Sequence, residues 1–146
     1  MPSLELEVDG VTARFALRDD LAPQTVRALV ASLPVETTLR HCRWSGDACF
    51  AEIARGPILE ISALESGVTS IYPGTLVLRP ANAIAPTAEI LIAYGDAEYR
   101  WPTSRMYVTP VGEVQGDPSA LFKVLAKTSS AGQTTVRLAA LKEAVA

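Results

Sequence analysis

Residues 39–53 read Leu-Arg-His-Cys-Arg-Trp-Ser-Gly-Asp-Ala-Cys-Phe-Ala-Glu-Ile. This stretch holds the only histidine, both cysteines and one of the two tryptophans of the chain. Two runs that favour strands flank Ser45-Gly46, so the stretch predicts a β-hairpin whose two-residue loop is this dipeptide. That register places His41 opposite Phe50 across the hairpin.

His41 and Arg43 are the strongest candidates for a functional site. Side chains alternate between the two faces of a strand, so these two residues are predicted to share one face. An imidazole exchanges protons near neutral pH, and a guanidinium binds a carboxylate through two parallel hydrogen bonds. We therefore expect a ligand with one anionic end and one polar group near the imidazole. A structural alternative stays open, in which Arg43 pairs with Asp47 or Glu52 and His41 is a satisfied, partly buried residue.

Cys42 and Cys49 are opposite each other in the predicted register, at a Cα separation that permits a disulfide. The first ten residues contain neither a basic region nor a long apolar run, so we expect a cytoplasmic protein with two free thiols. Adjacent strand residues point to opposite faces, which argues against a catalytic pair of Cys42 and His41. One histidine and two cysteines fall short of a usual zinc site, and no glycine-rich phosphate motif occurs. We expect neither a metal nor a cofactor.

The composition is that of one globular domain over residues 1–146, because 49% of the residues are hydrophobic and the chain is long enough to bury a core. The net charge of −3 argues against nucleic acid as a partner. No run approaches the roughly 20 apolar residues of a membrane span, so no membrane association is expected. The apolar content favours a homo-oligomer that buries part of its surface between subunits.

The first part of the chain shows clear local signals. Apolar and acidic residues alternate over 4–8, Asp9-Gly10 predicts a tight turn, and residues 11–17 form the returning strand. Pro23 stands where a helix tolerates proline, and an apolar stripe follows it, which predicts a helix over 23–32. Asp117-Pro118 starts a second predicted helix, over 118–127.

The second part of the chain gives weaker signals. Residues 89–94 are apolar apart from Glu89, which is typical of a strand buried on both faces. Residues 95–105 are predicted to be irregular, and 106–111 and 134–138 to be strands. The alanine-rich tail, 139–146, is predicted to extend as a helix. Short strands and two helices without βαβ alternation predict a mostly β barrel or sandwich with helices at its ends.

Several short motifs resemble the bacterial cyclophilin-like proteins of unknown function, over residues 4 to about 112. They are Ala22-Pro23-Gln24-Thr25-Val26, Leu33-Pro34, residues 41–48 of the stretch quoted first, Tyr72-Pro73-Gly74 and Tyr94-Gly95. The resemblance implies a closed, cyclophilin-like β-barrel capped by two α-helices. Cyclophilins carry a strand arginine followed by a Phe-x-x-Gln stretch. No such stretch follows Arg43, so we expect no prolyl isomerase activity.

Trp44, Tyr72 and Tyr94 complete the predicted site with His41 and Arg43. The two tyrosines lie at the ends of predicted strands, where a barrel mouth would be, and Trp44 is placed to cap a pocket. The expected function is binding of a small organic acid or amide in a pocket at the end of the barrel. Two alternatives stay open: an enzyme acting on small acids or amides, with His41 as acid–base and Arg43 as anion clamp, and a structural oligomer without a ligand.

Overall fold

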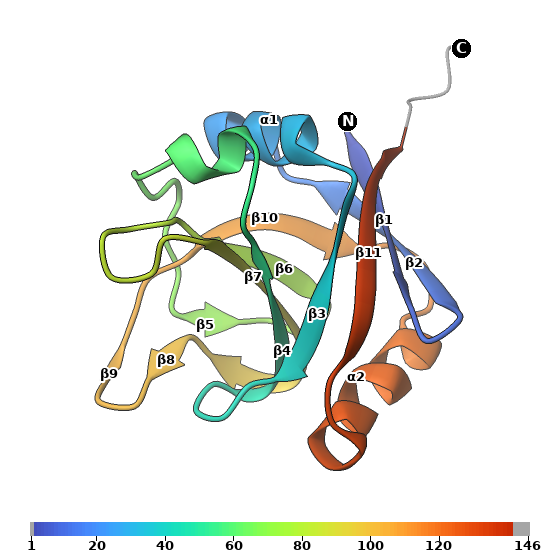
Figure 1. Cartoon of the computed structure of the whole chain (residues 1–146). Helices are drawn as coiled ribbons and strands as arrows, with labels where there is room; N and C mark the ends of the chain where they lie inside the picture. The colour runs from blue at the N-terminus through green and yellow to red at the C-terminus, as the bar shows by residue number, and fades with distance from the viewer. Residues whose placement is uncertain (1, 142–146) are drawn as a thin grey trace.

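The computed structural model describes residues 2–141, which form a closed antiparallel β-barrel with a helix at either end (Figure 1). The strand order around the barrel is β4-β3-β11-β1-β2-β10-β6-β7, and pairing between β4 and β7 closes it. The predicted mostly β fold is therefore confirmed. The barrel strands are β1 (Ser3–Val8), β2 (Val11–Leu17), β3 (Val35–His41), β4 (Gly46–Ile53), β6 (Thr75–Arg79), β7 (Ala88–Glu98), β10 (Thr109–Val114) and β11 (Thr134–Leu141).

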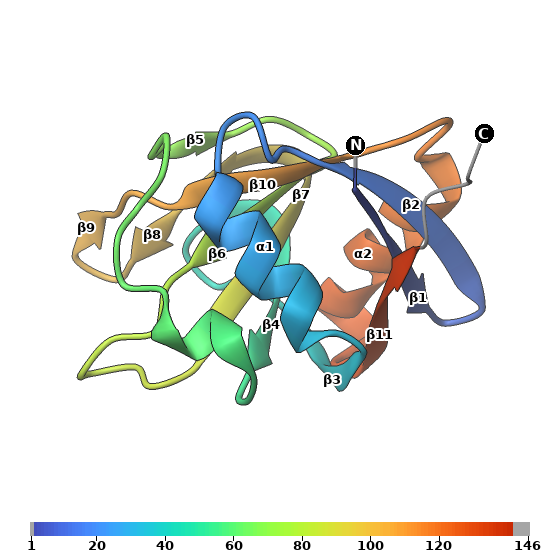
Figure 2. The ribbon, with the colours of Figure 1, turned by 90° about the horizontal axis from the view of Figure 1, so that it is seen from above.

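The remaining elements cover or decorate the barrel. Helix α1 lies across one opening, as the view from above shows (Figure 2), and α2 packs at the other end. No helix within residues 2–141 is long and apolar enough to cross a membrane. These elements are α1 (Pro23–Ser32), the 3₁₀ turn η1 (Pro57–Glu60), β5 (Ser70–Ile71), β8 (Arg100–Trp101), β9 (Ser104–Arg105) and α2 (Ser119–Ala131).

The first hairpin forms as its sequence predicts. Val8 is opposite Val11, so the loop holds two residues. Asp9 and Gly10 both have positive φ, 48° and 76°, which is the conformation that a tight turn between twisted strands requires. The first helix also coincides with its predicted bounds of 23–32.

A distant carboxylate caps the N-terminus of α1, because Ala22 has no side chain that can do so. Glu65 accepts hydrogen bonds from the backbone N–H of Thr25 at 2.7 Å and of Gln24 at 3.3 Å. It also accepts one from the Thr25 hydroxyl at 2.7 Å. These bonds lower the pKa of Glu65 and satisfy donors that the helix leaves open.

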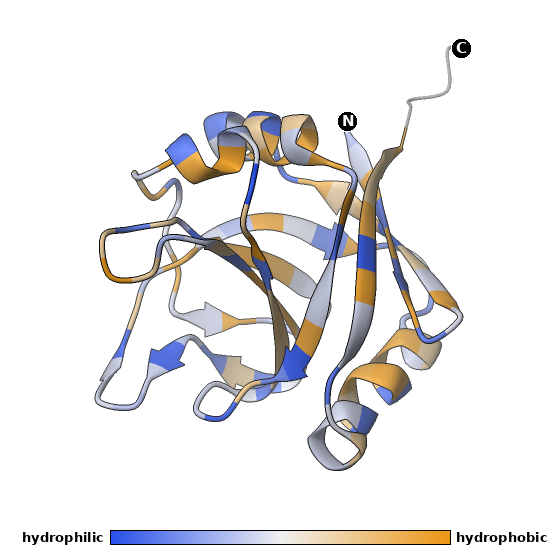
Figure 3. Ribbon diagram, in the orientation of Figure 1, coloured by the Kyte–Doolittle hydropathy of each residue, from blue (hydrophilic) through white to orange (hydrophobic). Residues whose placement is uncertain are grey.

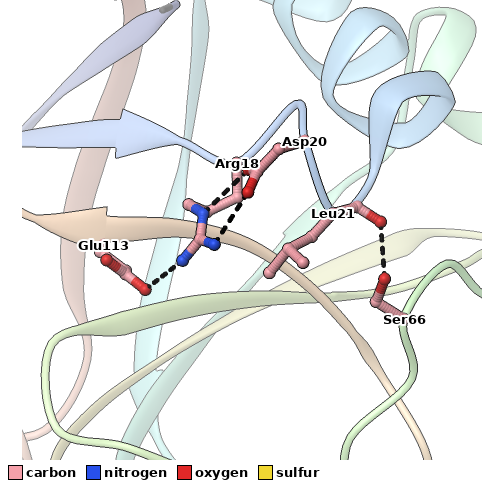
Figure 4. Close-up of polar contacts among 5 residues, drawn as sticks. All are labelled: Arg18, Asp20, Leu21, Ser66 and Glu113. Atoms are coloured by element: carbon pink, nitrogen blue, oxygen red, sulfur yellow. Dashed lines mark hydrogen bonds and ion pairs between the residues drawn. The ribbon is translucent and has the colours of Figure 1, made fainter.

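The segment between β2 and α1 is held by side chains from two other parts of the chain (Figure 4). Arg18 donates two hydrogen bonds to Asp20, both 2.9 Å, and one to Glu113 at 2.7 Å. The Arg18 guanidinium holds the pKa of Asp20 below its ordinary value. Ser66 donates its hydroxyl to the Leu21 carbonyl, which ties the loop before β5 to the same segment.

Hydrophobic side chains form two separate clusters, one inside the barrel and one on its outer face. Figure 3 shows apolar and polar residues alternating along several of the strands. Residues 90–93 of β7 are all buried, because Ile90 and Ile92 face the inner core while Leu91 and Ala93 face the outer cluster. This arrangement confirms the prediction of a strand buried on both faces. The outer cluster consists of Ala48, Ile71, Val77, Leu91, Ala93, Tyr99 and Val108.

Four predictions for the second half of the chain differ from the structure. Helix α2 continues to Ala131, past the serines that were expected to end it near 127. Ser129 and Ser130 instead bond back to carbonyls three residues earlier, and the helix ends before Gly132, whose φ is +87°.

The tail does not extend as a helix over its described part, 139–141, which belongs to β11 and pairs with β1. The rest of the predicted extension, 142–146, lies outside the described residues. Residues 95–105 are not irregular, since β7 runs to Glu98 and a short β8–β9 hairpin follows. In addition, the strand predicted at 106–111 begins three residues later, at Thr109.

Candidate functional site

The hairpin between β3 and β4 differs from its prediction by one residue of register. Strand β3 ends at His41, β4 begins at Gly46, and the loop between them is 42–45. His41 is opposite Cys49 rather than Phe50. The predicted two-residue loop is therefore wrong, and the arginine and tryptophan that were placed on the strand lie in an irregular loop.

Contacts with the end of β7 explain the longer loop. The Ser45 carbonyl accepts the N–H of Glu98 at 2.9 Å, and the Ser45 hydroxyl accepts the N–H of Arg100 at 3.2 Å. Gly46 has a φ of +92°, and a Cβ there would lie 2.4 Å from the carbonyl oxygen of Asp96. The Ser-Gly dipeptide thus docks the loop onto a distant strand instead of forming a tight turn.

This docking creates a pocket of about 320 Å³, lined by residues 40–45, Phe50, Glu89 and residues 99–101. Phe50 and Glu89 lie on the outer face of β4 and β7, because the alternate residues of both strands belong to the inner core. The pocket therefore opens on the outside of the barrel, between the 42–45 loop and β8, and not at the barrel end as predicted from the sequence.

Arg43 stands at the rim of this pocket and is exposed to solvent. Within residues 2–141, Arg43 forms no ion pair, so neither Asp47 nor Glu52 neutralises it. The structural alternative for Arg43 accordingly finds no support among the described contacts.

Two further arginines line the pocket, and both already have partners. Arg40 donates its Nε–H to the side chain of Gln133 at 3.1 Å. Arg100 has a looser contact, with its Nη1 3.9 Å from Oε1 of Glu98. The sequence analysis selected neither residue, and Arg100 joins the lining only because the 42–45 loop docks on β8.

Aromatic side chains supply much of the apolar lining. Trp44, Trp101, Phe50 and Tyr99 all line the pocket. Trp44 is 52% exposed, whereas Tyr99 is buried. The chain contains two tryptophans, and both are in this lining.

The interior side of the pocket carries a hydrogen-bonded carboxyl group, Glu89. The Tyr99 hydroxyl donates to Glu89 Oε1 at 2.9 Å, and Arg79 Nη2 lies 3.6 Å from Oε2. Burial raises the pKa of Glu89 above its ordinary value, although Arg79 and Tyr99 act in the opposite direction. Sequence reasoning did not place Glu89 in the site, but its position as the one charged residue of an otherwise apolar run was a usable signal.

His41 forms a dyad with Tyr94 on the inner side of the strands. Its Nδ1 lies 2.8 Å from the Cys42 carbonyl, which only accepts, so Nδ1 is assigned as the donor. Nε2 then accepts from the Tyr94 hydroxyl at 2.6 Å. Burial raises the pKa of Tyr94. Both imidazole nitrogens are thus occupied by protein groups.

The two cysteines are free thiols, as predicted. Cys49 is buried in the inner core, 3.3 Å from the Leu125 carbonyl and 3.2 Å from the Thr128 hydroxyl of α2. Burial raises the pKa of Cys49 to about 11 and also raises that of Cys42. Both thiols are therefore protonated at neutral pH and poorly nucleophilic.

The five residues predicted from the sequence are distributed over three places. His41, Arg43 and Trp44 line the pocket. Tyr94 contacts His41 but is not part of the lining. Tyr72 is 81% exposed between β5 and β6 and is not part of the lining either.

The closed barrel with its two helices is a mostly β domain of cyclophilin-like fold. Comparison with protein families shows that the chain belongs to DUF3830, a family described as a protein of unknown function, whose model matches residues 4–140. No curated protein matches the chain.

Solved structures confirm the fold at low sequence identity. The structure of McbB in complex with tryptophan has a TM-score of 0.73 and 20% identity, over 98% of this chain and 46% of McbB. The chain thus spans less than half of McbB. The hypothetical protein AF2241 from Archaeoglobus fulgidus has a TM-score of 0.58 and 17% identity, covering 94% of this chain and 93% of AF2241.

A cyclophilin-type peptidyl-prolyl cis–trans isomerase from Cryptosporidium parvum has a TM-score of 0.57 and 12% identity. The match covers 98% of this chain and 99% of the isomerase. The predicted relationship to cyclophilins is therefore correct for the fold.

Proposed function

We propose that this domain binds a small carboxylate with an aromatic or apolar body in the pocket on the outer face of the barrel. The observation that carries the proposal is Arg43, a guanidinium without a described ion pair, set beside Trp44 and Trp101 at the rim of an apolar-lined pocket. The Arg43 guanidinium offers a carboxylate two parallel hydrogen-bond donors. A tryptophan ring can pack against the aromatic body of the ligand, or against the guanidinium itself.

The dimensions support a small ligand. A volume of about 320 Å³ lies at the lower end of the range for small-molecule sites. The McbB structure contains tryptophan, which is itself a carboxylate with an aromatic body, and this supports the choice of ligand class.

The contacts of His41 favour a binding function over one in which His41 acts as a catalytic acid–base. Both of its nitrogens are engaged, one by Cys42 and the other by Tyr94. Proton transfer to a ligand would first require one of these bonds to break. The sequence after Arg43 also lacks the Phe-x-x-Gln stretch of cyclophilins, so the proposal does not include prolyl isomerisation.

The test uses the intrinsic fluorescence of the protein, because both tryptophans line the pocket. Titration with 3-phenylpropionate is expected to change the emission saturably, whereas its neutral amide binds more weakly. Arg43→Lys keeps the charge but loses the paired donors, so it is expected to weaken the binding of the carboxylate by about 1–3 kcal/mol.

Arg14→Lys is the matched control, since Arg14 is exposed on β2 and takes no part in the pocket. It should leave the affinity unchanged. If no small aliphatic or aromatic acid produces a saturable change, or if Arg43→Lys binds as well as the wild type, the proposed function is wrong.

A further inference from the structure

Glu89 is the polar group of the pocket that carboxylate binding does not use. It lies on the same outer face as Phe50, in the next row of side chains. Phe50 is opposite Leu91 across the β4–β7 pair, and Glu89 is two residues from Leu91. A strand rises about 3.3 Å per residue, so this row is about 7 Å beyond Phe50 along the sheet.

Hydrogen-bonding capacity remains on Glu89 after its protein contacts are counted. The Tyr99 hydroxyl occupies one site on Oε1, and Arg79 approaches Oε2 at 3.6 Å, beyond normal hydrogen-bond length. A carboxylate has about four acceptor positions. Its side chain is 16% exposed and lines the pocket, so the remaining capacity is accessible from there.

We infer that Glu89 is a second binding point, which selects acids whose aromatic body carries an N–H donor, with Arg43 holding the carboxylate. This inference rests on the proposed function and narrows its ligand class to heteroaromatic acids of the indole type. The aromatic body would lie against Phe50 and the two tryptophans, which line the same pocket as Arg43 and Glu89. A ligand of the same shape without the donor buries Glu89 without a partner for its free acceptor positions, which is costly.

The experiment compares two acids of nearly equal shape, indole-3-acetate and 1-benzothiophene-3-acetate, in which sulfur replaces the N–H. Isothermal titration calorimetry on the wild type should show the indole acid binding about tenfold more tightly, as expected for a hydrogen bond to a charged acceptor. In Glu89→Gln this preference should fall severalfold, because the indole acid loses its charged acceptor and the benzothiophene acid no longer buries an unpaired carboxylate.

Glu52→Gln is the matched control. Glu52 is opposite Glu89 on the same sheet face, but it is exposed and does not line the pocket. It should preserve the preference for the indole acid. Because the wild-type comparison needs no variant, the inference remains testable even if Glu89→Gln fails to fold.

The outcomes separate the two proposals. Equal wild-type affinities for both acids, with binding still dependent on Arg43, would overturn the role of Glu89 and leave the proposed function standing. An equal loss of affinity for both acids in Glu89→Gln would also overturn it. Binding of neither acid, nor of any other carboxylate, would overturn the proposed function itself.

Discussion

On the inner face of the strands, His41 and Tyr94 bond to each other, although His41 also borders the pocket, whereas on the outer face Arg43 and Glu89 line that open pocket. The inner groups use their hydrogen bonds within the protein. Arg43 has no ion pair among the described residues, and Glu89 retains acceptor positions. The difference indicates that the inner dyad stabilises the fold, and that the outer groups are available to a ligand.

The covering elements account for this difference. Helix α2 packs against the inner core at its end of the barrel. Leu125 is fully buried there, and the Cys49 thiol contacts the Leu125 carbonyl. The outer face is covered by the 42–45 loop and by the segment 99–101, which includes β8. The two segments meet through Ser45 and leave space between their aromatic side chains. Helix α2 fills the surface that it covers, whereas the two docked segments leave a cavity where their side chains do not meet.

The largest effect is expected from a substitution that separates the loops of the outer pocket. In Gly46→Ala, the positive φ and the close carbonyl of Asp96 together should cost about 3 kcal/mol of unfolding free energy. Ligand affinity should also fall, because the 42–45 loop must move. Urea denaturation measures the first effect, and acid titration of the folded protein measures the second.

Gly116→Ala is the control for backbone strain alone. Gly116 has a φ of +73°, but a Cβ there would meet nothing within 4 Å. Its cost should be about 1 kcal/mol, without loss of ligand affinity. Equal costs for the two variants would show that the contact with Asp96 does not hold the loop.

A smaller effect is expected on the inner face. Tyr94→Phe removes the donor to His41 Nε2 and should lower the unfolding free energy by about 1 kcal/mol, the usual contribution of one hydrogen bond. Affinity for carboxylates should stay within about twofold of the wild type, since Tyr94 does not line the pocket. A large loss of affinity with unchanged stability would instead place the dyad in the functional site.

The smallest effect concerns the pH dependence of stability at Glu89. Burial raises its pKa in the folded state above the ordinary 4.5, so the folded protein binds more protons than the unfolded chain in the pH range above 4.5. The Glu89 carboxyl therefore contributes to the free energy of unfolding at pH values below 4.5, and this contribution is lost as the pH rises through the folded-state pKa. Thermal unfolding of the wild type, measured relative to Glu89→Gln, should shift in favour of the wild type as pH falls from 7 toward 4.5. A shift in the opposite direction would contradict the raised pKa.

The two glycine-containing turns show how far local sequence predicts structure in this fold. Asp9-Gly10 joins β1 directly to β2, its neighbour in both sequence and sheet, and it forms the expected two-residue loop. Ser45-Gly46 carries a similar signal, but its neighbours in space are residues 96–100 of a distant segment. The contacts with that segment outweigh the local preference and shift the register by one residue.

The candidate site was only partly predictable for the same reason. His41, Arg43 and Trp44 are close in sequence and do line one pocket. Tyr72 and Tyr94 were chosen from their positions at strand ends, which do not specify the face or the neighbouring loop. The β8 residues Arg100 and Trp101 join the pocket from nearly sixty residues away, in a stretch that was predicted to be irregular.

The sequence by itself determined the mostly β class, the first hairpin and the first helix, because periodic burial and turn residues act over a few neighbouring positions. The closed barrel was implied only by the resemblance of its motifs to cyclophilin-like proteins. The sequence also determined that a histidine, an arginine and a tryptophan would lie together. Only the tertiary structure decided which side of the barrel holds the pocket and that Glu89 lies inside it. Those features depend on the docking of the 42–45 loop on β7 and β8, which is a contact between distant segments that no local pattern encodes.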